Sequence, residues 1–214
     1  MEKREDRQFL EMLAAAAKRI SETDIAEKCS YAGVGWDGER KQISLESFGI
    51  RSVISLPECT ADPPMHIWQH LAILHYLCEV GPSPSLEAWG SMAALRDGGA
   101  VRGSSFDREV NRMVSMRLGK HSSGHIIKAV GSLGGEINEN PKADLCALFR
   151  FMPRYPFLFN MWFADDEFPA SGRILVDGSV SPYLGTEANG TVASLLVQML
   201  CDAADRAAEA DTEQ

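Results

Sequence analysis

The chain has 214 residues, of which 45% are apolar and 24% are charged, with a net charge of −9 and an isoelectric point near 5.1. This is enough apolar sequence to bury a core, and we expect one domain over residues 1–214 with a frayed acidic tail after about residue 208. The negative field works against nucleic acid and anionic membranes as partners. No apolar run approaches the roughly 18 residues that predict a membrane span.

The five cysteines are odd in number and widely spaced, and no CxxC motif occurs. This pattern predicts small core residues in a reducing compartment rather than a disulfide framework, a zinc ribbon or a cysteine-held iron–sulfur cluster. The charged N-terminus, M-E-K-R-E-D-R, lacks the apolar segment of an export signal. We therefore expect a cytoplasmic protein.

The first half of the chain predicts a helix, a small sheet and a second helix. Residues 5–20 have the spacing of an amphipathic helix. Residues 31–36, 41–48 and 50–56, separated by glycine-containing turns, predict a three-stranded meander. Asp62 followed by Pro63-Pro64 is a typical helix start, because the carboxylate caps free N–H groups, and the helix should run to Glu79.

The second half predicts helices, then strands, then a closing helix. Helices are expected from Ser104 to Gly119 and over residues 122–133, and strands over residues 145–152, 157–163 and 173–176. An apolar stripe over residues 192–200 predicts a helix over residues 187–208. The order favours an α+β fold in which a largely antiparallel sheet, made of the N-terminal meander and the C-terminal hairpin strands, packs with about four to five helices.

The sequence supports neither of two common enzyme motifs. Residues 33–38 match GxGxxG, but the glycines lead into a strand pattern instead of the helix that a dinucleotide site needs. No GxSxG motif is present, and Cys78 faces the expected core, which disfavours acyl transfer.

Two pairs of histidines have helical spacing. His66 and His70 are four residues apart, as are His121 and His125, and imidazoles with this spacing share a metal ion in some proteins. Because core histidines more often donate to backbone carbonyls, we predict no metal and keep these four as secondary candidates. His75 lies at the margin of the apolar face of its helix, beside Trp68.

The segment from Arg96 to Lys128 is basic in an otherwise acidic chain. Seven basic residues occur there against three acidic ones. A solvated helix face is the first interpretation, and a local anion site is the alternative.

Three consecutive carboxylates, Asp165, Asp166 and Glu167, stand between apolar runs. A hydrated turn accounts for the charges, but it does not account for the aromatic residues on both sides, Trp162, Phe163 and Phe168. We expect this apolar bulk to press the loop against the body of the protein. A carboxylate held there either pairs with a basic or N–H group or coordinates a cation. Asp177, at the end of the next strand, should not join this cluster.

Four motifs together resemble one family. They are Ile73-Leu-His-Tyr-Leu77, Trp162 with Asp165-Asp-Glu-Phe-Pro-Ala170, Leu175-Val-Asp177 and Tyr183-Leu-Gly-Thr-Glu187, and they resemble the bacterial and archaeal family known as domain of unknown function 3786. The family pattern has a glutamate where this chain has Asp166. It often continues with an acid after Glu187, where this chain has Ala188-Asn-Gly190, and this difference predicts a shorter closing helix.

The resemblance implies an accessory or binding module in anaerobic cofactor or redox metabolism, with an iron–sulfur partner protein or a small molecule as ligand. The sequence names no cofactor. We expect the binding surface where the acidic hairpin, the margin of the histidine helix and the Tyr183 corner meet. Its residues are Trp68, His75, Trp162, Asp165, Asp166, Glu167, Tyr183 and Glu187. The alternative is a metal-dependent enzyme that uses Asp165 and Glu167.

Overall fold

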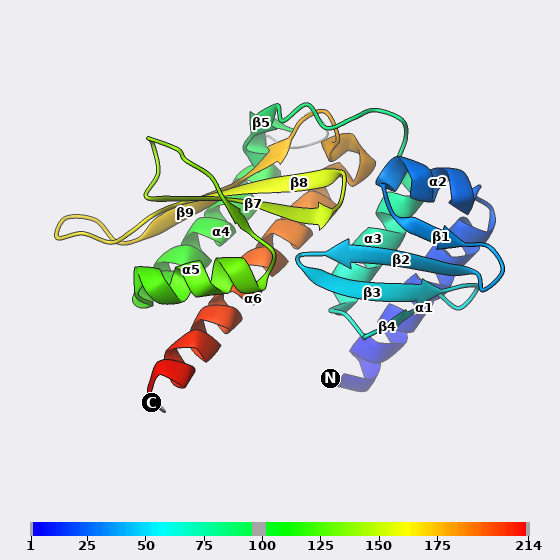
Figure 1. The fold of residues 1–214 in the computed structure, drawn as a ribbon, viewed down its shortest axis with the longest axis horizontal. Coiled ribbons are helices and arrows are strands. Elements are labelled where there is room, and N and C mark those ends of the chain that lie inside the picture. Colours follow the sequence, from blue (N-terminus) through cyan, green and yellow to red (C-terminus); the bar gives the residue numbers. More distant parts are fainter. Residues whose placement is uncertain (1, 96–101, 213–214) are drawn as a thin grey trace.

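The computed structural model of the protein describes residues 2–95 and 102–212. Its strands form two antiparallel sheets that lie side by side (Figure 1). The four-stranded sheet comes from the first third of the chain and the five-stranded sheet from the rest. Arg96 and Asp97, the first residues of the expected basic segment, lie outside the described residues.

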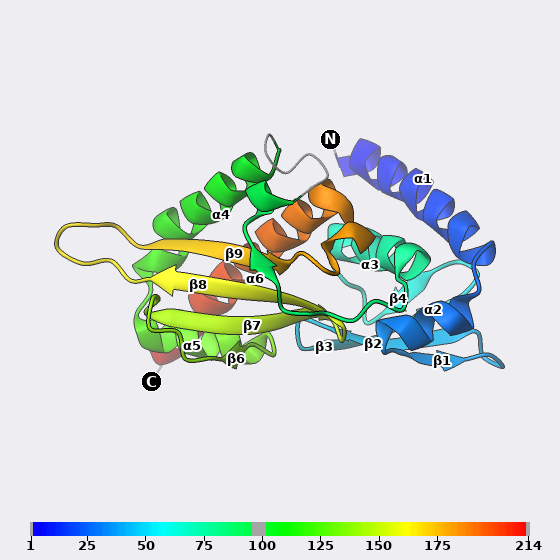
Figure 2. The ribbon, with the colours of Figure 1, turned by 90° about the horizontal axis from the view of Figure 1, so that it is seen from above.

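The four-stranded sheet has the order β1-β2-β3-β4. Its strands are β1 (Gly35–Asp37), β2 (Gln42–Ser47), β3 (Ile50–Ser55) and β4 (Thr60–Asp62). Ile43 and Leu45 are buried while Ser44 and Glu46 are exposed, so the sheet has one core face and one outer face. The helix α3 (Ile67–Glu79) lies behind the core face, and α1 (Glu2–Ser21) and α2 (Ile25–Ala32) pack against α3 (Figure 2).

The five-stranded sheet has the order β5-β9-β8-β7-β6. Its strands are β5 (Trp89–Gly90), β6 (Glu136–Ile137), β7 (Leu145–Met152), β8 (Tyr155–Trp162) and β9 (Ser171–Asp177). The helices packed with it are α4 (Ser104–Met116), α5 (Ser123–Ser132) and α6 (Gly185–Thr212). Short 3-10 helices are η1 (Met92–Ala94), η3 (Leu118–Lys120) and η4 (Ser181–Tyr183).

A tight turn at the end of β2 joins the two sheets. The backbone N–H of Phe48 donates to the carbonyl of Arg150 in β7 at 2.8 Å. Gly49 lies against Gly134, and a Cβ added to Gly49 would meet the Gly134 nitrogen at 2.7 Å. One connected set of buried residues extends through both sheets and their helices.

The α+β class with antiparallel sheets is confirmed. The sequence predicts one sheet and about four to five helices, whereas the described residues form two sheets and six α-helices. Phe48 and Gly49 both have positive φ, so the chain turns back there from β2 into β3. After the single backbone hydrogen bond from Phe48 to β7, the ladder of strand hydrogen bonds does not continue from one sheet to the other. No helix in the described ranges combines the length and apolar character of a membrane span.

The expected first strand, residues 31–36, is wrong at its start. Tyr31 and Ala32 close α2, which is capped by Asp24 at one end and by Gly33 at the other. Gly33 adopts the left-handed conformation, with φ of 74°, and its N–H donates to helix carbonyls. Only the residues from Gly35 onward pair with β2.

The expected cap of α3 is also wrong. Asp62 is the last residue of β4 and pairs with Val53, so its backbone is committed to the sheet. The helix begins five residues later at Ile67, and the His66 ring accepts a hydrogen bond from the N–H of Trp68. The carboxylate of Asp62 is therefore not used as a helix cap.

The closing helix is longer than expected at both ends. Ala188-Asn-Gly190 lies inside α6, where the Asn189 amide accepts from the Tyr155 hydroxyl and donates to the carbonyls of Ser181 and Gly185. Gly190 leaves space for the Phe106 ring, which would overlap a Cβ at that position. At the other end α6 continues to Thr212, and Asp211 contacts Lys128 and His125 on α5.

Gly49→Ala should destabilise the protein, because the new Cβ would lie 2.8 Å from the Leu133 carbonyl carbon and φ at this position is +74°. We expect a loss of about 2–3 kcal/mol in the free energy of unfolding. For a chain of this size that corresponds to a fall in Tm of about 5–10 °C by circular dichroism.

Gly131→Ala is the matched control, because nothing lies within 4 Å of its added Cβ and Gly131 is inside α5. Its Tm should stay level or rise, since alanine favours the helix. Equal Tm values for the two variants would show that the turn at Gly49 does not constrain the joint between the sheets.

Candidate functional site

The acidic hairpin projects from one end of the protein instead of folding back on it (Figures 1 and 2). Asp165 closes the turn: its Oδ1 accepts from the N–H groups of Glu167 at 2.9 Å and Phe168 at 2.7 Å. These backbone hydrogen bonds hold the pKa of Asp165 below its usual value. Phe168 is 66% exposed. The expectation that apolar bulk presses this loop against the body is therefore wrong.

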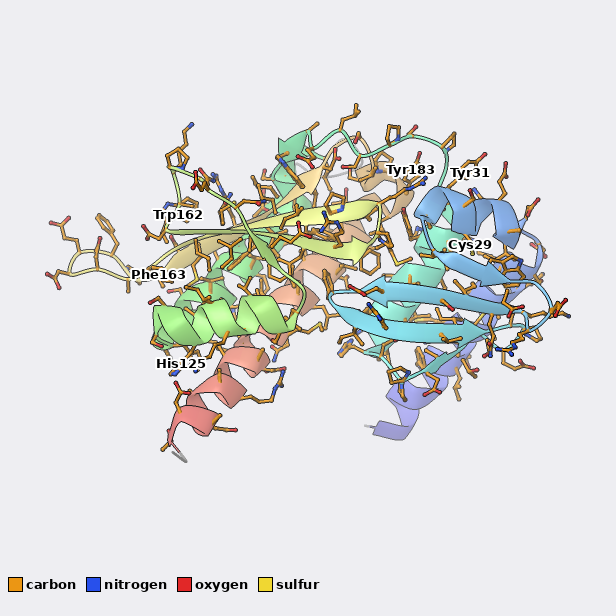
Figure 3. The ribbon with its side chains drawn as sticks, in the orientation of Figure 1. Cys29, Tyr31, His125, Trp162, Phe163 and Tyr183 are labelled. Carbon is orange, nitrogen blue, oxygen red and sulfur yellow. The ribbon has the colours of Figure 1, made fainter. Side chains whose placement is uncertain are left out.

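The other two aromatic residues of this stretch are accounted for at the base of the hairpin (Figure 3). The Trp162 indole N–H donates to the carbonyl of Lys142 at 2.7 Å, and the Arg173 guanidinium lies 5.3 Å from the ring centroid. The backbone N–H of Phe163 donates to the Asp144 carboxylate at 2.8 Å. These local contacts hold the base of the hairpin. They do not bring the hairpin tip against the body of the protein.

The remaining predicted residues lie away from the acidic hairpin. The His75 ring contacts the Arg19 guanidinium at 3.3 Å and forms a hydrogen bond with the backbone of Leu184, next to Tyr183. Burial, and then the nearby Arg19 charge, lower the pKa of His75. A groove of about 270 Å³ between α1 and α3 includes Arg19 and His75.

Trp68 and Glu187 complete the predicted set. Trp68 is 44% exposed near the start of α3, and Glu187 pairs with Arg102 at 3.0 Å. In Figure 3 Trp162 and Phe163 lie at the hairpin end, while Tyr183 lies toward the opposite end. The structure thus joins His75 to the Tyr183 corner but does not bring the acidic hairpin to them.

The four secondary metal candidates each have other surroundings. His66 caps α3, and His70 is buried, with a ring hydrogen bond to the backbone of Cys59 and no partner for Nε2 among the described residues. His121 and His125 contact Asp205 and Asp211, each at 3.0 Å. Within residues 2–95 and 102–212, no group of three or more His, Cys, Asp or Glu side chains is arranged to hold a metal ion.

The basic segment is largely paired within the fold. Arg117 reaches Asp202 at 2.9 Å and Asp205 at 3.3 Å on α6, and Lys128 reaches Asp211 at 2.8 Å. Arg112 pairs with Glu109 on its own helix. These pairs favour a solvated helix surface over an anion site.

The cysteines are free thiols, and four of the five are buried. Burial raises the pKa of Cys29, Cys59 and Cys201 to about 11, so these thiols stay protonated at neutral pH. This agrees with the prediction of core residues rather than a disulfide framework.

Asp177 is an anchor that the sequence does not reveal. It is fully buried at the end of β9, and its carboxylate accepts hydrogen bonds from Ser85, Glu87, Ala88 and Ser179. Burial raises its pKa, but hydrogen bonds from Ser179, Ser85 and Glu87 together outweigh that effect and hold the pKa below its usual value. Asp177 therefore fixes the segment that leads into β5.

A hollow of about 600 Å³ lies on the outer face of the four-stranded sheet. It is lined by residues 44–46 of β2 and 51–53 of β3, and at its sides by residues 33–35, 62–63 and Pro153 in the β7–β8 turn. A smaller hollow of about 290 Å³ shares Glu46 and Pro153 with it and reaches Gly49 and Gly134. We call the larger one the sheet hollow; the smaller one lies between it and the joint of the two sheets.

Sequence reasoning misses the sheet hollow, although it singles out two parts of it. Residues 33–38 are interpreted as strand and turn, and Gly35–Asp37 do form β1 with a turn after it, while Asp62 is assigned to a helix cap. Strand register brings them together, because Gly35 pairs with Ser44, Ser44 with Val53, and Val53 with Asp62. A single sequence gives no signal for that register.

A family model described as domain of unknown function (DUF3786) matches residues 24–199. The chain belongs to this family. Comparisons with curated proteins and with solved structures find no match. The DUF3786 region contains every residue that lines the sheet hollow. It begins after α1, so the α1–α3 groove takes part of its lining from outside the region.

In this DUF3786 protein, Asp177→Asn should lower the free energy of unfolding at pH 7 by about 3 kcal/mol, because charge-assisted hydrogen bonds are lost. The folded-state pKa is depressed, so the stabilisation is present above the ordinary value of 3.8 and is lost as the pH falls below it. Urea unfolding should therefore show a wild-type advantage at pH 7 that shrinks towards about pH 3.

Asp166→Asn is the control, since Asp166 is exposed at the hairpin tip. It should unfold like the wild type at both pH values. A difference between Asp177→Asn and the wild type that does not depend on pH would contradict an ionised anchor.

Proposed function

We propose that the protein is a non-catalytic binding module that holds a small ligand in the sheet hollow. The observation that carries this proposal is the hollow itself, which has a volume within the usual range of ligand pockets. Five separate segments of chain line it, and a sheet supplies a rigid floor. All five segments belong to the DUF3786 region.

The chemistry of the hollow suits binding rather than catalysis. Apolar surface comes from Val34, Val53, Pro63 and Pro153, and polar groups from Ser44, Asp62 and the Glu46–Arg51 pair. A mostly apolar surface with a few placed polar groups is typical of ligand sites. None of the lining residues is a histidine or a cysteine, and no histidine base stands beside Ser44 or Ser52 to activate a hydroxyl.

The wider setting rests on the family resemblance alone. From that resemblance we propose that the protein is a cytoplasmic accessory protein in the cofactor or redox metabolism of anaerobes, with a small molecule or a redox protein as partner. The metal-dependent alternative with Asp165 and Glu167 remains a prediction, and no observation on the projecting hairpin favours it.

The test is a fragment screen by amide NMR on the full chain. Fragments should shift the amide signals of residues 33–35, 44–46 and 51–53. Ser44→Trp should abolish these shifts, because Ser44 is exposed in the middle of the outer face and the indole would fill the hollow. Circular dichroism would verify that this variant is folded.

The matched control is Asp165→Asn with Glu167→Gln, which alters the hairpin tip only. It should leave the fragment shifts unchanged. Shifts that cluster at the hairpin, and that disappear in this double variant but persist in Ser44→Trp, would overturn the proposal and return the site to the acidic stretch.

A further inference from the structure

We infer that the sheet hollow selects an organic cation: a ligand with an apolar body and one ammonium or guanidinium group, which pairs with Asp62. This inference rests on the proposed function and names the ligand class for the same site. It depends on where the strand register places Asp62, on the pairing of the other charges and on the apolar lining between them.

Strand register places Asp62 on the outer face. Residues directly opposite each other in antiparallel strands point to the same side, and the pairs Gly35–Ser44, Ser44–Val53 and Val53–Asp62 form one row across the sheet. Ser44 is exposed on that side, whereas its neighbours Ile43 and Leu45 face the core. With strands about 4.8 Å apart, the row is about 14 Å long.

Asp62 carries the one unpaired charge that lines the hollow. Its carboxylate forms no hydrogen bond or ion pair with any residue that the structure describes, because its backbone belongs to β4 and His66 caps α3 instead. The other charged residues of the lining, Glu46 and Arg51, pair with each other at 3.1 Å. The lining therefore has a net charge of one negative, located at Asp62.

A positive group lies near the opposite end of the row, against Gly33, two residues before Gly35. Arg154 lies against Gly33, with its Nε 3.2 Å from the position of an added Cβ, and it donates to the carbonyl of Tyr31 at 3.1 Å. A cationic ligand is repelled there and attracted at Asp62. The two ends thus orient the ligand with its charged group on β4.

The surface between these ends suits an apolar body. Val34, Val53, Pro63 and Pro153 line it, and both prolines keep their shape with little side-chain freedom to lose on binding. An anion at the Asp62 end of the row would be repelled by the carboxylate. A bare metal ion would find one carboxylate where Mg²⁺ or Ca²⁺ needs several oxygen ligands.

The test uses two fluorescent probes that share an apolar group and differ in charge. Monodansylcadaverine carries a primary ammonium, and dansylglycine carries a carboxylate. In titrations of the full chain, the cation should bind about fivefold more tightly than the anion, the ratio expected for one ion pair near a surface. Raising the salt concentration should reduce this ratio.

Two isosteric variants assign the effect to one carboxylate. Asp62→Asn should remove the preference for the cation. Glu58→Gln removes one negative charge from the nearby β3–β4 turn, where Glu58 is exposed and does not line the hollow, and it should keep the preference. Ser44→Trp should weaken binding of both probes.

The outcomes separate this inference from the proposed function. If both probes bind equally and Ser44→Trp blocks them, the hollow is a ligand site without charge selection, and the inference alone is wrong. The inference is also wrong if Asp62→Asn and Glu58→Gln weaken cation binding equally, because the net charge of the protein then causes the preference. If neither probe binds in a way that Ser44→Trp prevents, both proposals are wrong.

Discussion

The close approach of two backbones at Gly49 and Gly134 is the constraint on which the rest of the structure depends. Neither position tolerates a Cβ, since each would overlap main-chain atoms of the other. Because the backbones are close, the Phe48 N–H donates to the carbonyl of Arg150. The β7–β8 turn follows Arg150 and brings Pro153 to the outer face of the four-stranded sheet. The sheet hollow therefore takes part of its lining from the β7–β8 turn because the two sheets meet at this joint.

Two aspartates at strand ends show how the fold assigns different roles to the same side chain. Asp177 ends β9 next to a segment that offers hydroxyl and N–H donors, and it is fully buried as an ionised anchor. Asp62 ends β4 next to Pro63 and Pro64, which have no N–H groups to offer. Its carboxylate stays exposed and without a partner among the described residues. Local donors, rather than the aspartate itself, decide which of the two is structural.

The sequence predicts well those elements whose signal is local. The strand over residues 145–152 is correct to the residue, and the helix expected over residues 122–133 forms over Ser123–Ser132, with Ser122 as its cap. Two other elements are missed or shifted for different reasons. The caps of α2, Asp24 and the left-handed Gly33, are local signals that the prediction does not use. α6 accepts Gly190 because of a tertiary contact, since the Phe106 ring fills the space.

The candidate site is predicted less well than the fold, for a related reason. Aromatic residues beside the acidic stretch suggest burial against a distant surface, but Trp162 finds its partners in Lys142 and Arg173, on neighbouring segments of the same sheet. His75 and the Tyr183 corner do meet, because His75 lies on α3, which packs against α6, and Tyr183 lies just before the start of α6. The sheet hollow needs a register across four strands, which no pattern within one strand specifies.

The alternation of residues in the strands explains why the sheet hollow forms on the outer face of the four-stranded sheet. In β7 almost every residue is buried. On the side of the sheet away from α4 and α6, Cys146 and Leu148 of β7 and Asn160 of β8 are also buried. From Ile43 to Ser47 buried and exposed residues of β2 alternate, so the outer face is built from Ser44 and Glu46, and none of the described helices covers it. A covered face has no room for a ligand. The outer face of the four-stranded sheet combines a few polar groups with the apolar Val34, Pro63 and Pro153, and it has room for a small molecule. For this reason we propose binding there rather than at the α1–α3 groove, where α1 already covers the surface of α3.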